Sequence, residues 1–145
     1  MSRIISFRGL LAKDAMDKLN LQTIQGLIGY KITKFEIIPA LPYQATGEHI
    51  VKIYKVQQSA ASASIDFSDN TLLAAGIINN DSAGYRYNST STIIFDNEKF
   101  NQNIYVTAAL SDGTSAINYY IELEQMALNK NESTVATLKD IRNND

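Results

Sequence analysis

The 145-residue sequence contains no cysteine, which removes two common ways of holding a fold together. Without thiols the chain forms neither disulfide bonds nor thiolate metal sites, so packing alone must stabilise it. No apolar run approaches the 18 residues of a membrane-spanning helix, and residues 1–9 lack the apolar stretch of a signal peptide. We therefore expect a protein that is made in the cytoplasm and has no membrane partner.

An excess of charge of one sign is also missing. The formal net charge is −2, and charged residues make up 19% of the chain. Phosphate backbones attract clusters of positive charge, so nucleic acid is not expected as a direct partner.

The residues that usually carry catalysis are few and lie outside the known motifs. His49 is the single histidine, and the sequence has no Gly-x-Ser-x-Gly, His-Glu-x-x-His or Gly-x-Gly-x-x-Gly pattern. Glu122 and Glu124 share one face of a predicted strand, as solvated acids commonly do. The remaining acids of interest do not have the spacing of a calcium loop: Asp66, Asp69, Asp96, Glu98 and Asp112. We expect no enzyme activity, no cofactor and no metal.

The clearest structural signal is the alternation of apolar and polar residues in 103–128. The two runs place these apolar residues on one side of an extended chain: Ile104, Val106, Ala108, Leu110, and then Ile117, Tyr119, Ile121, Leu123. Residues 111–115, Ser-Asp-Gly-Thr-Ser, are turn formers, so the two runs are predicted to pair as a hairpin. The apolar face of that hairpin requires a second layer of strands to cover it.

Other short extended runs are separated by turn residues. Strands are predicted at 3–9, 30–39, 50–56, 65–67 and 92–96, and a slip of the apolar phase within 30–39 indicates a bulge. Residues 16–21 fit an edge strand, although 10–21 also fits a helical stripe.

Ser68 has the position of an N-cap, so a short helix is predicted near 69–76. The resulting fold class is all-β, an antiparallel β-sandwich or jelly roll of seven or eight strands in one domain, residues 1–128. In residues 129–145, Val135, Leu138 and Ile141 recur every third residue. This spacing predicts a short helix or an arm that packs on the domain or on a neighbour.

Several exposed positions have the composition of a contact surface. Tyr85, Arg86 and Tyr87 lie in the long polar stretch 79–91, where large rigid rings beside an arginine are typical of interaction hot spots. The alternative is that these rings fold back onto the sandwich. The further candidates are Tyr105 and Tyr120, on the strand faces opposite the predicted core, and the apolar Leu138 and Ile141.

Four segments, residues 1–9, 29–35, 93–105 and 117–124, together resemble a group of small proteins encoded by tailed phages of marine bacteria. The resemblance spans nearly the whole chain. It implies a non-enzymatic virion part, made in the bacterial cytoplasm. The leading expectation is a capsid decoration, or cement, subunit that binds between major capsid proteins. A homo-oligomer is a further expectation, and no functional residue carries over.

Two other functions remain open. A receptor- or glycan-binding module of a tail or fibre would stack sugar on Tyr85 and Tyr87. An accessory domain of a hydrolase would require a convergent set of acids among Asp66, Asp69, Asp96 and Glu98.

Overall fold

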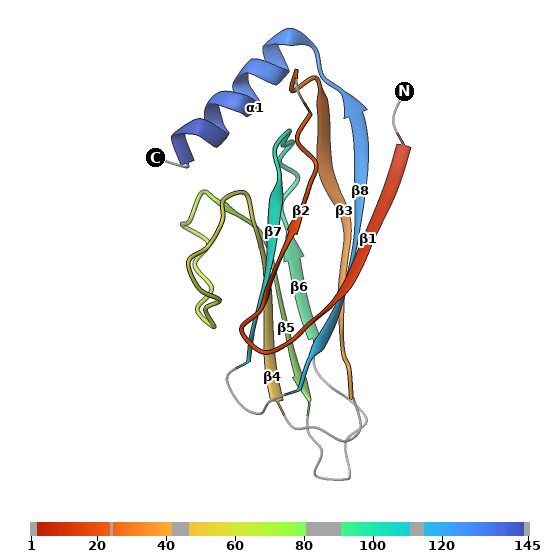
Figure 1. Cartoon of the computed structure of the whole chain (residues 1–145), viewed down its shortest axis with the longest axis vertical. Helices are drawn as coiled ribbons and strands as arrows, with labels where there is room; N and C mark the ends of the chain where they lie inside the picture. Colours follow the sequence, from red (N-terminus) through yellow and green to blue (C-terminus); the bar gives the residue numbers. More distant parts are fainter. Residues whose placement is uncertain (1–2, 24, 42–46, 81–90, 111–114, 144–145) are drawn as a thin grey trace.

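A computed structural model describes residues 3–23, 25–41, 47–80, 91–110 and 115–143 (Figure 1). Eight strands and one helix lie within these residues: β1 (Arg3–Leu11), β2 (Met16–Leu19), β3 (Ile28–Pro39), β4 (Gly47–Tyr54), β5 (Leu72–Asn80), β6 (Ser91–Phe95), β7 (Ile104–Leu110), β8 (Ile117–Ala127) and α1 (Lys130–Asn143). The strands form two antiparallel sheets, ordered β1-β8-β3 and β2-β7-β4-β5-β6. The predicted all-β antiparallel sandwich is confirmed.

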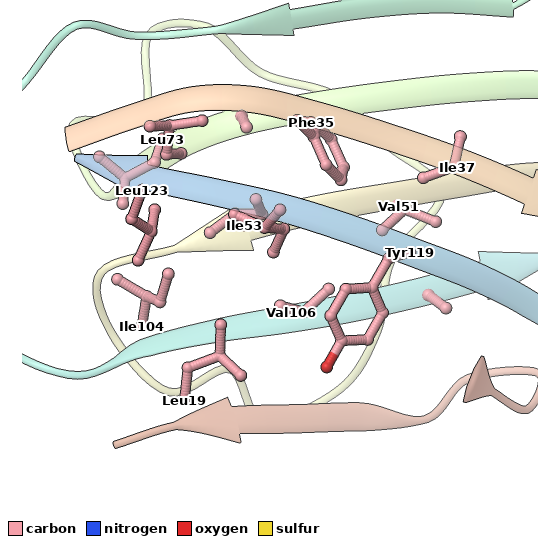
Figure 2. Packing of buried hydrophobic residues seen from close by; sticks show 14 of the residues in the cluster. Leu19, Phe35, Ile37, Val51, Ile53, Leu73, Ile104, Val106, Tyr119 and Leu123 are labelled. Carbon is pink, nitrogen blue, oxygen red and sulfur yellow. The ribbon is translucent and has the colours of Figure 1, made fainter. Parts of the chain in front are cut away.

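The core lies between the two sheets. Val51 and Ile53 of β4 and Ile121 and Leu123 of β8 are fully buried, and Figure 2 shows side chains of the two layers meeting. Alternate residues of a strand point to opposite faces, so each strand contributes every second side chain to this core. The bulge predicted in β3 is confirmed by a register shift between Ile32 and Lys34. The edge strand predicted at 16–21 is confirmed as β2.

The predicted hairpin of 103–128 is wrong, although both of its strands and their buried faces are confirmed. β7 pairs with β2 and β4, whereas β8 pairs with β1 and β3, so the two strands lie in different sheets. A hairpin would turn both apolar faces to the same side. In opposite layers the two faces cover each other, which buries more apolar surface.

The helix predicted near 69–76 is also wrong, because β5 occupies 72–80. The residues that suggested a helix cap make turns instead. The Asp66 carboxylate accepts a hydrogen bond from the Ser68 N–H at 2.9 Å, and the Asp69 carboxylate accepts one from the Thr71 N–H at 2.8 Å. Such Asx turns compete directly with helix capping for the same side chains.

The run predicted at 65–67 belongs to the connection 55–71 rather than to a strand. This connection lies on the outer side of the five-stranded sheet (Figure 1). There the ammonium of the buried Lys52 donates to the carbonyl oxygen of Ser64 and lies 5.4 Å from the centre of the Tyr54 ring.

Candidate functional site

Helix α1 begins with a reciprocal pair of hydrogen bonds. The Asn129 Oδ1 accepts from the Glu132 N–H at 2.8 Å, and the Glu132 Oε1 accepts from the Asn129 N–H at 3.4 Å. This is a capping box, which satisfies amides that the first helical turn leaves free. The spacing Asn-x-x-Glu is visible in the sequence and would have placed the helix start, but the sequence reasoning missed it.

The side of α1 that faces the sandwich is polar. The Ser133 hydroxyl donates to the Gly26 carbonyl oxygen at 2.8 Å. The amide of the buried Asn101 donates to the same carbonyl at 3.0 Å and to the Thr137 Oγ1 at 2.9 Å. Gly26 has a φ of +66°, and a Cβ there would lie 3.0 Å from the Asn101 Nδ2. Hydrogen bonds therefore anchor α1, and the tight turn at Gly26 makes room for them.

Ion pairs add to this anchoring at both ends of the helix. The Glu98 carboxylate lies 2.8 Å from the Lys55 Nζ and 3.5 Å from the Lys139 Nζ. Lys99 and Glu132 pair at 2.9 Å, and this hydrogen bond, with the Asn129 amide, lowers the pKa of the Glu132 carboxyl. Lys55 is buried, whereas Lys99 and Lys139 are exposed. Pairs of exposed lysines stabilise weakly, so the main effect of the Lys99 and Lys139 pairs is to fix the orientation of the helix.

The apolar residues of α1 point away from the sandwich. Val135, Leu138 and Ile141 are 54%, 59% and 54% exposed. A helix on a soluble protein normally turns its apolar stripe to the core, and here the polar side does so instead. We call Val135, Leu138 and Ile141 the α1 apolar face. It contains two of the predicted contact residues, Leu138 and Ile141, and exposed apolar clusters of this kind mark interaction sites.

The two predicted tyrosines do not join this surface. Tyr105 lies on the outer side of the five-stranded sheet and Tyr120 on the outer side of the three-stranded sheet, and both are half-buried. The Tyr120 hydroxyl donates to the Glu122 carboxylate at 2.8 Å, and this hydrogen bond raises the pKa of Tyr120. The Lys34 Nζ lies 6.0 Å from the centre of its ring. The predicted Tyr85, Arg86 and Tyr87 lie outside the described residues.

A second apolar patch lies on the outer side of the three-stranded sheet, beside Tyr120. Leu10 of β1 and Ile38 of β3 both pair with Asn118 of the central strand β8, one from each side. They are 57% and 60% exposed. The sequence reasoning missed this patch, because the two residues are distant in the chain and meet only through the register of β8.

An open cleft of about 750 Å³ is lined by β6 and the residues after it, by the start of β5 and the segment before it, and by Lys139 of α1. Three of the candidate acids line it: Asp69, Asp96 and Glu98. Each is already engaged by a neighbour. Asp69 accepts from the Thr71 N–H, Asp96 accepts from the Glu98 N–H at 3.0 Å, and Glu98 pairs with Lys55. Within the described part of the chain, no group of three or more histidines and acids is placed to hold a metal.

His49 lies in the interior, on β4. It is 1% exposed, and its Nε2 lies 3.4 Å from the Ser115 hydroxyl oxygen. Burial lowers the pKa of His49, which favours the neutral ring. The position fits a buried histidine satisfied by a hydroxyl partner.

Among the described residues, no helix has the length and apolar character needed to cross a membrane. No protein-family model matches the sequence, and no curated protein matches it. One solved structure that it resembles is described as Bacillus endospore appendages that form a family of disulfide-linked pili. The two chains are 8% identical, the TM-score is 0.37, and the match covers 89% of this chain and 92% of that chain. A likeness this low carries no conclusion about function.

Proposed function

We propose that this protein is a structural component of a phage particle, a capsid decoration subunit that binds between major capsid proteins. It would be made in the bacterial cytoplasm and act in the virion, without enzyme activity. Two lines of support are independent of each other. The first is the resemblance of four segments to small proteins of tailed phages, and the second is the arrangement of α1.

The α1 apolar face carries the proposal. The polar side of the helix is already satisfied by Gly26 and Asn101 of the sandwich. The apolar side faces solvent, and each of its three residues is more than half exposed. Covering the exposed parts of Val135, Leu138 and Ile141 would contribute about 1 kcal/mol each, since complete burial of such a side chain contributes roughly 1.5–3 kcal/mol.

The chemistry of the remaining side chains supports a structural role as well. The acids in the cleft are occupied by local amides and by Lys55, and His49 is buried with Ser115 as its neighbour. A general acid or base needs a titratable group within reach of a substrate. The described acids of the cleft instead stabilise turns and the end of α1.

The test is binding to purified expanded capsids that lack this protein, measured by co-sedimentation. The double variant Leu138→Asp/Ile141→Asp places two charges on the α1 apolar face and should bind at least tenfold more weakly. Truncation before residue 134 is a poorer test, because it also removes Thr137, the partner of Asn101.

The matched control is Leu10→Asp/Ile38→Asp, which adds the same charges at two equally exposed apolar positions of the other patch. It should bind capsids like the wild type. Equal loss of binding in both variants, or no capsid binding by the wild type, would contradict the proposal.

The alternative, a receptor- or glycan-binding module, is favoured by one feature of the cleft. The exposed ring of Phe67 stands beside Asn70, Asp96 and Asn97, and sugars commonly stack on an aromatic ring flanked by polar groups. A glycan array separates the two functions, because a decoration subunit should bind capsids and ignore glycans. Glycan binding that is lost in Phe67→Ala would favour the alternative.

A further inference from the structure

The two sheets leave four edge strands, and three of them carry charged residues. The described edges are β1 and β3 of one sheet and β2 and β6 of the other. The charges on the first three are Arg3 and Arg8 in β1, Lys31, Lys34 and Glu36 in β3, and Asp17 and Lys18 in β2. Such charges protect an edge from pairing with another strand. The sequence of β6, Ser-Thr-Ile-Ile-Phe, has neither a charge nor a proline.

The backbone of β6 presents hydrogen-bonding groups at its free side. The Asp96 N–H donates to the Leu73 carbonyl oxygen of the neighbouring chain segment at 2.8 Å. Backbone groups alternate in direction along an antiparallel strand, so those of Ile94 also point toward β5. The N–H and C=O groups of Ile93 and Phe95 therefore point outward from the edge of the sheet.

The side chains near this edge are apolar and accessible. Ile94 is 51% exposed, and Phe95 is exposed beside it. All five residues of β6 are neutral and four of them, Thr92 to Phe95, are β-branched or aromatic, a composition that favours addition of another strand.

We propose that β6 pairs antiparallel with β6 of a second copy of this chain, about a twofold axis at Ile93. The two five-stranded sheets then continue into one another across the interface. The two Ile93 residues exchange both backbone hydrogen bonds, and Ser91 of each copy pairs with Phe95 of the other. Thr92 faces Ile94 across the strands.

A second copy fits this edge because the strand is neutral and complementary to itself. With Ile93 at the centre, the Asp96 residues of the two copies are six strand positions apart, about 20 Å at roughly 3.4 Å per residue. That separation exceeds the screening length of about 8–10 Å at physiological salt, so their carboxylates do not oppose the pairing. The interface uses none of the α1 apolar face, and the inference does not depend on the proposed function.

Light scattering during size-exclusion chromatography tests the pairing. The wild type should have twice the 16.1 kDa mass of one chain. The variant Thr92→Lys/Ile94→Lys places lysines directly opposite each other at two points and should be a monomer, since like charges across strands are unfavourable. Thr92→Glu/Ile94→Glu should also be a monomer. An equimolar mixture of the two should restore the dimer, which shows that both variants are folded.

The control is Leu10→Lys/Ile38→Lys, which adds the same charges to the outer side of the other sheet and should remain a dimer. A monomeric wild type at its highest soluble concentration would overturn the inference, as would a dimeric lysine variant. A mixture that stays monomeric while both variants show native circular dichroism would overturn it too. A wild-type assembly larger than a dimer would also overturn the twofold pairing. A monomer that binds capsids through β6 would overturn it as well, because the edge would then pair with a strand of another protein. Leu138→Asp/Ile141→Asp should stay dimeric whatever its capsid binding.

Discussion

The hydroxyl of Tyr119 links the two sheets, and its removal gives a direct test of the packing. Tyr119 belongs to β8, and its hydroxyl donates to the Asp17 Oδ2 of the edge strand β2 at 2.7 Å. Figure 2 shows the ring between the layers with the hydroxyl directed toward β2. Gly9 lies alongside, and a Cβ there would be 2.8 Å from the hydroxyl oxygen. The close approach of the ring to the β1 backbone therefore requires glycine.

The variant Tyr119→Phe keeps the buried ring and removes only this hydrogen bond. Hydrogen bonds to charged acceptors contribute roughly 1.5–3 kcal/mol. Asp17 is half-buried and regains some water when the donor is lost, so the expected decrease in the free energy of unfolding is about 1–2 kcal/mol. Urea unfolding measures it. A cycle with Asp17→Ala should give a coupling energy of similar size, because the two groups are in contact.

The same contact predicts how stability changes in alkali. Burial, the hydrogen bond to Asp17 and its charge raise the pKa of Tyr119 above the ordinary 10.0. The folded protein thus keeps a proton that the unfolded chain releases. The stabilisation is complete below pH 10 and falls as pH rises further, by up to about 1.4 kcal/mol per pH unit. Tyr119→Phe should lose stability less steeply, with a remainder from Tyr30, whose pKa is raised by burial, and from Tyr120, whose pKa is raised by its hydrogen bond to Glu122.

Two results would refute this reasoning. One is a Tyr119→Phe variant as stable as the wild type at neutral pH, which would mean that the hydroxyl contributes nothing to the contact between sheets. The other is an equally steep alkaline decline in both proteins, which would mean that Tyr119 titrates in the folded state as it does in the unfolded chain.

Three further predictions concern the core, the helix anchor and the buried histidine. Leu123→Ala should cost about 2–5 kcal/mol in urea unfolding, because the side chain is fully buried, whereas Leu138→Ala on the exposed α1 apolar face should change stability by less than about 0.5 kcal/mol. Asn101→Ala removes the hydrogen bonds to Gly26, Thr137 and Gln102, and loss of the one to Thr137 should speed amide exchange in α1 about tenfold. Unchanged exchange would contradict the anchor. Burial lowers the pKa of His49 in the folded protein. The contribution of the neutral ring to the free energy of unfolding is therefore complete above pH 6.5 and is lost as pH falls below that value. His49→Gln should give a flatter acid profile than the wild type, and parallel profiles would contradict this.

Local patterns predicted the strands and their buried faces. The alternation in 104–110 and 117–123 correctly placed Val106 and Ile121 in the core, because the direction of a side chain depends only on its position along the strand. Pairing depends on contacts between distant segments. The turn residues 111–115 suggested a hairpin, yet each strand pairs with others in its own sheet. The sequence alone could not show this, since the alternation of apolar residues along each strand is the same in either arrangement.

The short helix near 69–76 failed for a different reason. Asp66, Ser68 and Asp69 are suited both to capping a helix and to closing Asx turns. What decides between the two is the pairing of the next residues, Leu72–Asn80, with β4 and β6. That pairing is a tertiary effect, which overrides a weak local preference.

The candidate surface was predictable in position but not in orientation. The spacing of Val135, Leu138 and Ile141 indicated a short helix or an arm, and Leu138 and Ile141 were candidates for a contact surface. Their outward direction follows from Asn101 and Gly26, which reach the helix from distant parts of the chain. A periodic apolar stripe alone normally indicates the buried side of a helix.

The two proposals together predict a difference in capsid binding that neither predicts alone. A dimer joined at β6 carries two α1 apolar faces, so one dimer could contact two capsid sites at once. The second contact would then be intramolecular, and such linkage strengthens binding by roughly 10²–10⁴-fold without any new contact. The monomeric variant Thr92→Lys/Ile94→Lys should therefore bind expanded capsids at least tenfold more weakly than the wild type, although its α1 apolar face is intact. Titration of both proteins on the same capsids measures the ratio. Equal affinities, with the dimer established in solution, would show that the two faces do not reach neighbouring sites simultaneously.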